Sequence, residues 1–174
     1  INKLAGELDW DFLQQVFPPI GEGLWRMHQE GVVHLDVKPA NVLLRTSGQP
    51  LLLDFGAAQT MDNDNRFGSF QTLTHGFAPP EQYLDGNLGP WTDIYGLAAT
   101  IYNCITGHSP PPALKRRDGA SLEKLTVSRS GAYPYTLLKV VEDALSLDQG
   151  QRPHDMHAFL SLAFGASSHT PVKT

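Results

Sequence analysis

The stretch from residue 34 to residue 56 constrains the fold of this chain more than any other, because it holds two short apolar runs between polar residues. The runs are Val42–Leu44 and Leu51–Leu53, and a turn centred on Gly48 separates them. Short apolar runs on either side of a glycine-containing turn predict a β-hairpin. In such a hairpin the residues just before the first strand lie close to those just after the second.

A carboxamide and a carboxylate stand at these two ends of the predicted hairpin. Asn41 comes directly before the first run and Asp54 directly after the second. Their oxygen atoms are ligands that a hard divalent cation such as Mg²⁺ prefers. Asp36 and Lys38 belong to neither strand, so they would face whatever the metal holds. A carboxylate, an ammonium group and a metal site at one point are what phosphoryl transfer requires.

The two segments HLDVKPANVLL and LLLDFG resemble the catalytic loop and the metal-binding D-F-G motif of the eukaryotic-type protein kinases. The Lys38-Pro39 pair is similar to the Ser/Thr branch of that family. The resemblance implies an α+β, mainly α, kinase-like fold whose helical C-lobe carries the hairpin and both motifs. It also implies ATP-dependent phosphoryl transfer to Ser or Thr of a protein substrate.

The resemblance assigns a role to each residue of the motifs. Asp36 would accept or orient the proton of the substrate hydroxyl, and Lys38 would neutralise charge on the moving phosphoryl group. Lys38, Asn41 and Asp54 would hold ATP, with Mg²⁺ on Asn41 and Asp54, and Leu43 would lie under the adenine ring. Outside this context, Asp36 would be an ordinary loop aspartate and Lys38 a solvated lysine. Leu43 would be a plain strand residue, which is compatible with contact to adenine.

Three further residues would support the site if the resemblance holds. His34 would pack under Phe55 without taking part in the chemistry. Asp93, which otherwise reads as an acid favoured at a helix start, would bind the backbone of the catalytic loop. Near the end of the predicted activation segment, from Asp54 to Glu81, Thr74 would hydrogen-bond Asp36 and Lys38.

The segment TLTHGFAPPEQY resembles the G-T-P-x-Y-x-A-P-E ending of a kinase activation segment. The resemblance implies that its glutamate, Glu81, forms a buried bidentate pair with Arg152. Pro79 stands where the family has alanine.

Leu35 departs from the family, which commonly has arginine at this position. That arginine pairs with a phosphorylated residue, whereas leucine cannot form charge-assisted hydrogen bonds. We therefore predict that phosphorylation at Thr60, Ser69 or Thr72 does not activate this protein in that way.

The remaining chain reads as a helical scaffold. A helix is predicted from residue 10 to residue 30, kinked or split at Pro18 and Pro19 and stopped by Gly31. A brief strand follows at residues 32–33. A buried helix is predicted from Trp91 to Thr106, with Cys104 as a core residue. We expect an exposed loop with a solvated basic cluster at residues 109–119 and short helices near 121–127, 135–147 and 153–164. Residues 1–164 would form a partial kinase domain, and residues 165–174 a flexible tail.

Composition excludes several classes of protein. The net charge of −5 argues against a nucleic-acid binder that works through general positive charge. No apolar run approaches the roughly 18 residues of a membrane span, so we expect no membrane segment within this chain. The single cysteine excludes an intramolecular disulfide, and we expect a cytoplasmic protein.

The motifs of the smaller kinase lobe are missing from the sequence. It contains no G-x-G-x-x-G loop and no V-A-I-K lysine, and it does not begin with methionine. We therefore expect a C-lobe without its N-lobe, weak or inactive alone, with an N-lobe possible in a longer protein. Two alternatives remain: a pseudokinase that binds partners, and a small-molecule phosphotransferase of the aminoglycoside-kinase kind, which also has an H-x-D-x-x-x-x-N loop.

Overall fold

Helices dominate the structure, a computed structural model that describes residues 8–61, 73–84 and 86–165. The α-helices are α1 (Trp10–Gln29), α2 (Pro80–Tyr83), α3 (Pro90–Thr106), α4 (Ala113–Arg117), α5 (Leu125–Ser128), α6 (Tyr135–Ala144) and α7 (Met156–Phe164). The strands are β1 (Val32–Val33), β2 (Val42–Leu44), β3 (Pro50–Leu52) and β4 (Gln59–Thr60). Three 3₁₀ turns cover Pro39–Asn41, Phe55–Ala57 and Gln149–Gln151. The fold is therefore α+β with a large excess of helix, as predicted.

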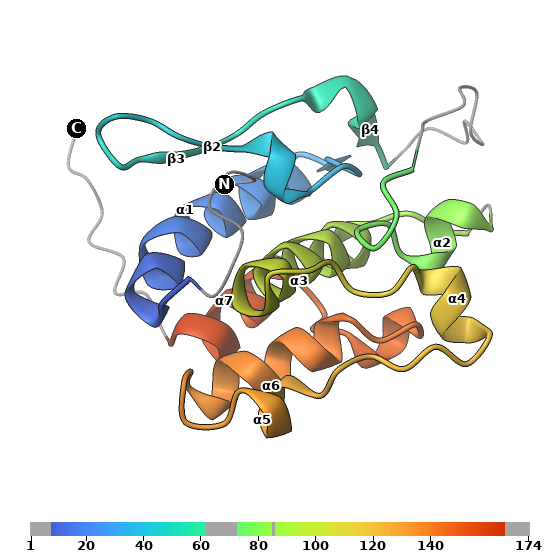
Figure 1. Cartoon of the computed structure of the whole chain (residues 1–174). Helices are drawn as coiled ribbons and strands as arrows, with labels where there is room; N and C mark the ends of the chain where they lie inside the picture. The colour runs from blue at the N-terminus through green and yellow to red at the C-terminus, as the bar shows by residue number, and fades with distance from the viewer. Residues whose placement is uncertain (1–7, 62–72, 85, 166–174) are drawn as a thin grey trace.

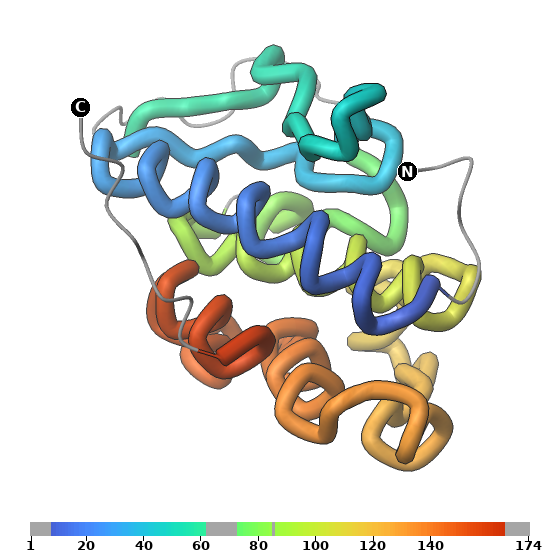
Figure 2. Tube along the Cα trace, turned by 90° about the vertical axis from the view of Figure 1, so that its left-hand side faces the viewer, coloured from blue at the N-terminus to red at the C-terminus, as the bar shows by residue number. Residues whose placement is uncertain are grey.

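The long helix α3 lies at the centre of the molecule. It contacts α1 on one side and α6 and α7 on another, while strands β1 and β3 contact α1. Figures 1 and 2 both show the strands on one side of α3 and the helices α6 and α7 on the opposite side. Nearly all of α3 is buried, which agrees with its sequence because an all-round apolar helix belongs in a core. None of the described helices is long and apolar enough to cross a membrane.

Helix α1 continues through its two internal prolines. The splitting alternative is therefore wrong, since one helix spans Trp10–Gln29. Pro18 and Pro19 cannot donate to the carbonyl groups of Gln14 and Gln15, four residues earlier. Both glutamines are exposed, so water can satisfy those carbonyl groups. The helix ends where predicted, and Gly31 just after it has a φ of +72°.

Two antiparallel pairs of strands position the loops above α1. The predicted hairpin is confirmed, with Val42 opposite Leu52 and Leu43 opposite Leu51. The predicted strand β1 is also present, and it pairs with β4, whose formation the sequence did not indicate.

One segment differs clearly from its prediction. Within residues 109–119, expected to be a loop, Ala113–Arg117 form the short helix α4. Ala113 is fully buried, and Arg116 is not simply solvated. The guanidinium group of Arg116 donates to the carbonyl of Leu145 at 2.7 Å and to the hydroxyl of Tyr95 at 3.3 Å. The prolines at 110–112 precede this helix and do not interrupt it, and the burial of Ala113 packs one face of it against the core.

The other short helices lie near their predicted places but are shorter. Helix α5 begins at Leu125, α6 ends at Ala144 and α7 begins at Met156. The predicted tail at 165–174 lies, except for residue 165, outside the described residues.

Candidate active site

Asp36, Lys38 and Thr74 form a closed cluster of polar contacts. The ammonium group of Lys38 lies 2.8 Å from one carboxylate oxygen of Asp36 and donates to the Thr74 hydroxyl at 3.0 Å. The Thr74 hydroxyl donates in turn to the other oxygen of Asp36 at 3.3 Å. A negative, a positive and a hydroxyl group are thus held together from two distant segments of the chain.

Asn41 joins the cluster from the 3₁₀ turn that precedes β2. Its amide nitrogen donates to the backbone carbonyl of Asp36 at 2.8 Å and to the Asp36 carboxylate at 3.0 Å. Because the nitrogen is engaged, the amide oxygen is the end of Asn41 left for a cation. The backbone amide of Leu53 donates to the carbonyl of Asn41 at 2.8 Å. This bond extends the hairpin and sets Asn41 beside the residue that precedes Asp54.

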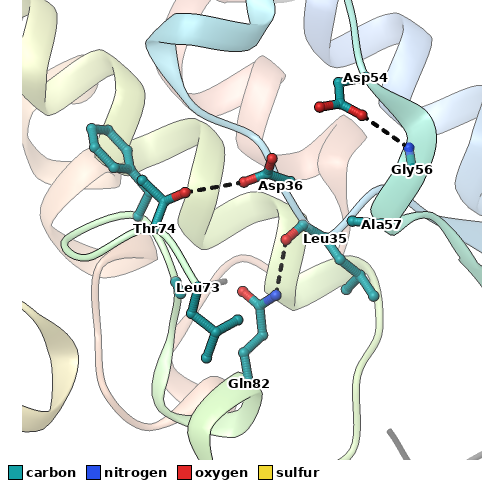
Figure 3. Close-up of a pocket in the computed structure, with 10 residues that line it drawn as sticks. Leu35, Asp36, Asp54, Gly56, Ala57, Leu73, Thr74 and Gln82 are labelled. Carbon is teal, nitrogen blue, oxygen red and sulfur yellow. Dashed lines mark hydrogen bonds between the residues drawn. The ribbon is translucent and has the colours of Figure 1, made fainter. Parts of the chain in front are cut away.

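Asp54 stands at the far end of the hairpin in an unusual backbone conformation. Its φ is +62°, in the left-handed region that few residues other than glycine adopt, aspartate among them. Its carboxylate accepts a hydrogen bond from the backbone amide of Gly56 at 3.1 Å. The side chain is exposed and lines the same pocket as Asp36. Figure 3 shows both carboxylates at this pocket.

The oxygen atoms of Asn41 and Asp54 suit Mg²⁺ in number and kind. Within the described residues, no group of three or more His, Cys, Asp or Glu could hold a metal ion by itself. Mg²⁺ is commonly bound through one or two protein oxygens, with waters and substrate phosphates completing its shell. The residues present therefore fit a magnesium ion that arrives with a nucleotide better than an ion in a protein cage.

A buried carboxylate holds the backbone of the catalytic loop from below. Asp93 on α3 accepts hydrogen bonds from the backbone amides of His34 and Leu35, both at 2.8 Å, as the resemblance implied. The ring of His28 makes a third contact at 2.8 Å. Sequence reasoning missed His28, although its spacing of four from Leu24 places it on the buried face of α1.

The ring of His34 links the loop to the D-F-G motif. It is fully buried and meets the ring of Phe55 edge-on at a centroid distance of 5.1 Å, which confirms the predicted packing. Its Nδ1 accepts a hydrogen bond from the backbone amide of Asp36 at 3.3 Å. His34 thus connects the backbone at Asp36 to the residue that follows Asp54.

Helix α3 approaches the loop most closely at Gly96. A β-carbon built there would lie only 3.0 Å from the carbonyl oxygen of Val37 and 3.1 Å from its Cβ. Both contacts are tighter than ordinary van der Waals contact, so a side chain there would require Val37 to shift, and glycine avoids this. Gly96 therefore sets how near the residue between Asp36 and Lys38 can lie to the helix.

Leu35 and Gln82 form the wall of the pocket below Asp36. Leu35 has a φ of +67°, and its carbonyl accepts a hydrogen bond from the Gln82 side chain at 2.9 Å. The pocket has a volume of about 190 Å³. It is lined by Leu35, Asp36, Asp54, Gly56, Ala57, Leu73, Thr74, Phe77, Ala78 and Gln82. Gln82 was not singled out in the sequence.

Leu43, the residue proposed to lie under adenine, is not part of this pocket. It is 45% exposed and lies opposite Leu51 in the hairpin. The structure therefore brings Asp36, Lys38, Asn41 and Thr74 into direct contact, whereas Leu43 lies on the outer face of β2.

The predicted ion pair between Glu81 and Arg152 is confirmed. The guanidinium group donates to both carboxylate oxygens of Glu81, at 2.6 and 3.0 Å, and also to the carbonyl groups of Trp91 and Ser146. It lies 5.0 Å from the ring centre of Tyr95, and burial raises the pKa of the Tyr95 hydroxyl. The pair ties α2 to the segment before α7.

Comparisons with known proteins find a matching family, similar sequences and a similar fold. The family profile described as "Protein kinase domain" matches residues 4–161 of the chain. The serine/threonine-protein kinase PknK of Mycobacterium tuberculosis is 31% identical over 163 residues, which cover 85% of this chain and 14% of PknK. PknL, of the same species, is 36% identical over 96 residues, or 55% of this chain and 24% of PknL.

A solved structure described as the apo form of PpkA-294 has a similar fold. It superimposes with a TM-score of 0.76 and 33% sequence identity, over 89% of this chain and 54% of that one. The chain therefore spans about half the length of this solved relative and about a seventh of PknK.

Proposed function

The chain belongs to the protein kinase family, and we propose that it supplies the catalytic lobe for ATP-dependent phosphoryl transfer to a serine or threonine of a protein substrate. The observation that carries the proposal is the closed cluster of Asp36, Lys38 and Thr74 with Asn41 beside it. Such a cluster combines a proton acceptor and a fixed positive charge, and positioning with electrostatic stabilisation is most of what phosphoryl transfer needs.

Asp36 would take the proton from the acceptor hydroxyl. Its two oxygens already receive hydrogen bonds from Thr74 and Asn41, which fix the orientation of the carboxylate. A positioned base of this kind contributes about 10²–10⁴-fold to the rate.

Lys38 would place its positive charge against the phosphoryl group as charge develops there. Its contacts with Asp36 and Thr74 hold the ammonium group in place before substrate binds. A positive group that is already in place stabilises the transition state more than one that must first move into position.

Asn41 and Asp54 would hold the magnesium ion of MgATP, which neutralises phosphate charge when bound. Leu43 would meet the adenine ring on the outer face of the hairpin, where it is exposed. The magnesium assignment rests on the oxygen ligands described above, and the adenine assignment rests on the family pattern and on the exposure of Leu43.

The acceptor we propose is a protein rather than a small molecule. Thr74 contacts Asp36 and Lys38, and Glu81 pairs with Arg152; both features belong to the protein-kinase pattern and not to the aminoglycoside-kinase alternative. The similar proteins PknK and PknL are described as serine/threonine-protein kinases.

The proposal also includes a small lobe contributed by a longer protein. The hairpin exposes Leu43 and Leu51, which lie opposite each other, and Leu53 just after its second strand is exposed as well. Exposed apolar groups gathered on neighbouring strands mark an interaction surface. A lobe seated there would cover the nucleotide, so we expect the isolated chain to bind ATP weakly. We place the protein in the cytoplasm, whose reducing conditions suit the free thiol of Cys104.

The test is transfer of labelled phosphate from ATP to a mixture of serine- and threonine-containing proteins by the longest natural form of the protein. We expect transfer by the unmodified protein, and a loss of about 10²–10⁴-fold in Asp36→Asn. Asp118→Asn, which changes an exposed carboxylate, is the matched control. Equal activity of the Asp36→Asn variant and the unmodified protein would refute the proposal. An unmodified protein that neither transfers phosphate nor binds ATP would favour the pseudokinase alternative.

A further inference from the structure

Gln82 makes a buried hydrogen bond that the proposed roles of the site residues do not account for. The residue belongs to α2 and is only 6% exposed. Its side-chain nitrogen donates to the backbone carbonyl of Leu35 at 2.9 Å, and Figure 3 shows this bond beside Asp36. A buried amide group is costly unless it is hydrogen-bonded, so the side chain of Gln82 and the carbonyl of Leu35 hold each other in place.

The backbone of Leu35 needs such a restraint. Its φ is +67°, in the left-handed region where a side chain crowds the backbone. Among the described residues other than glycine, only Asp54 shares a positive φ, and aspartate tolerates that conformation better than leucine does. A strained conformation of this kind persists only where the surrounding structure holds it.

Two side chains hold the peptide group between Leu35 and Asp36 from opposite sides. Gln82 donates to its carbonyl oxygen, and its N–H group, which belongs to Asp36, donates to Nδ1 of His34 at 3.3 Å. Because the C=O and N–H groups of a trans peptide point in opposite directions in one plane, the two bonds fix the rotation of that plane. The rotation sets the direction in which the Asp36 side chain leaves the backbone.

The bond from Gln82 is the shorter of the two, at 2.9 Å against 3.3 Å. Asp93 does not replace it, because Asp93 holds the amide of Leu35, which belongs to the preceding peptide group. Without Gln82, Leu35 could relax from its left-handed conformation and turn this peptide group. The carboxylate of Asp36 would then lose its alignment with Thr74, which contacts it from the same described segment as Gln82.

We propose that Gln82 is a positioning residue for phosphoryl transfer, which acts through the backbone of Leu35 to orient the carboxylate of Asp36. The inference rests on the proposed function, in which Asp36 accepts the proton of the acceptor hydroxyl. Gln82 contributes to the orientation of this base and not to the binding of ATP. Loss of its donor should therefore lower kcat and leave the KM for ATP nearly unchanged.

The first test removes the donor and keeps the length of the side chain. Gln82→Met supplies an unbranched apolar chain, and Gln82→Glu replaces the amide nitrogen by an oxygen that accepts hydrogen bonds. We expect each to lower the kcat of the longest natural form of the protein at least about tenfold, because a small misplacement of catalytic groups costs that much. Gln29→Met, at an exposed glutamine that ends α1, is the matched control and should leave kcat unchanged.

A second test asks whether the effect passes through Leu35. Glycine adopts a positive φ without steric cost, so Leu35→Gly removes the strain that the bond from Gln82 restrains. In this background Gln82→Met should lower kcat by a factor about three times smaller than in the unmodified protein, since the effects of residues in contact are not additive. A role of Gln82 in packing alone would give the same factor in both backgrounds.

The third test needs no transfer activity, so it separates this inference from the proposed function. Hydrogen–deuterium exchange is measured on the 174-residue chain. Gln82→Met should speed exchange of the Asp36 amide at least about tenfold relative to Gln29→Met, because a weakened local contact opens more often. Exchange of the buried amides of α3, which reports unfolding of the whole chain, should not change.

Three results would overturn the inference. These are an unchanged kcat in Gln82→Met and Gln82→Glu, an equal or larger fall of kcat in the Leu35→Gly background, and exchange at Asp36 no faster than in the control. If Gln82→Met does not fold, Gln82→Glu takes its place in each comparison. If no form of the protein transfers phosphate, the proposed function fails, and the exchange measurement still decides whether Gln82 holds the peptide group.

Discussion

The ring of His28 lies 2.8 Å from the carboxylate of Asp93, in a place where both side chains are almost fully buried. The Asp93 carboxylate also accepts hydrogen bonds from the backbone amides of His34 and Leu35. Helix α1, helix α3 and the catalytic loop therefore meet at one carboxylate. Its hydrogen bonds set the position of the residues just before Asp36.

Replacing His28 should loosen this junction. We expect His28→Ala to lower the free energy of unfolding by about 1.5–3 kcal/mol, the usual effect of losing a hydrogen bond to a charged group. Urea denaturation measures the change. His154→Ala, at a histidine whose side chain is 82% exposed, is the control and should have little effect. Equal effects of the two substitutions would show that the buried contact contributes nothing.

The hydroxyl group of Thr74 should contribute more to the rate of phosphoryl transfer than its methyl group does. Thr74→Val keeps the shape but removes the hydroxyl that joins Lys38 to Asp36. We expect kcat to fall by roughly tenfold to a hundredfold, because misplaced catalytic groups cost that much. The KM for peptide should change less. Thr74→Ser restores the hydroxyl and should recover most of the activity, and a Ser variant as slow as the Val variant would contradict this explanation.

Breaking the pair of Glu81 and Arg152 should destabilise the fold strongly. Arg152 is fully buried in its side chain, so Arg152→Ala leaves the Glu81 carboxylate without its main partner. We expect a loss of about 3–5 kcal/mol, measured as a lower melting temperature. Arg117→Ala, at an exposed arginine of α4, is the comparison. The double variant Glu81→Ala/Arg152→Ala should lose less than the sum of the two single variants.

Cys104 should be inert to thiol reagents in the folded protein. Burial raises the pKa of its thiol from 9.0 to about 12, and the thiolate is the reactive form. We expect no labelling at pH 8 until urea is added. Rapid labelling of the native protein at that pH would contradict the burial.

The same pKa predicts how stability depends on pH. Between about pH 9 and 12, the unfolded chain releases the Cys104 proton and the folded protein keeps it. The contribution to stability is complete below pH 9 and is lost as the pH rises toward 12. Urea denaturation at several pH values should show this slope, and Cys104→Ala should flatten it. A slope unchanged by the substitution would assign it to other groups.

Phosphomimetic changes should leave the activity nearly unchanged. Leu35 takes the place of an arginine that could bind phosphate, and the pocket beside it has an apolar wall. Glutamate at Thr60, Ser69 or Thr72 therefore meets no matching guanidinium at this position. A kinase assay on the three single variants tests this, and a large activation by any of them would contradict it. Ser69 and Thr72 lie outside the described residues.

Sequence reasoning predicted well those features that depend on short-range pattern or on matched motifs. The hairpin, the buried helix α3 and the pair of Glu81 with Arg152 are examples. A hairpin follows from two short apolar runs and the turn between them, and all three are local features of the sequence. The ion pair, in contrast, was found only because both partners stand in recognisable surroundings.

Features that depend on tertiary environment were missed or mistaken. Helix α1 continues through Pro18 and Pro19 at a point where Gln14 and Gln15, the residues four positions earlier, are exposed. The role of His28 depends on Asp93, which lies 65 positions away in the sequence. Arg116 is held by Leu145 and Tyr95, and no local pattern indicates those contacts.

The close approach of α3 to Val37 at Gly96 bears on the placement of Asp36 and Lys38, the two residues proposed to act in phosphoryl transfer. A single added methyl group there would lie 3.0 Å from the carbonyl oxygen of Val37 and 3.1 Å from its Cβ, so Val37 would have to shift by a few tenths of an ångström. A residue without a side chain thereby limits where the backbone between Asp36 and Lys38 can lie. Searches for substitutions that abolish transfer should therefore include Gly96, on the helix beneath the loop, as well as Asp36 and Lys38.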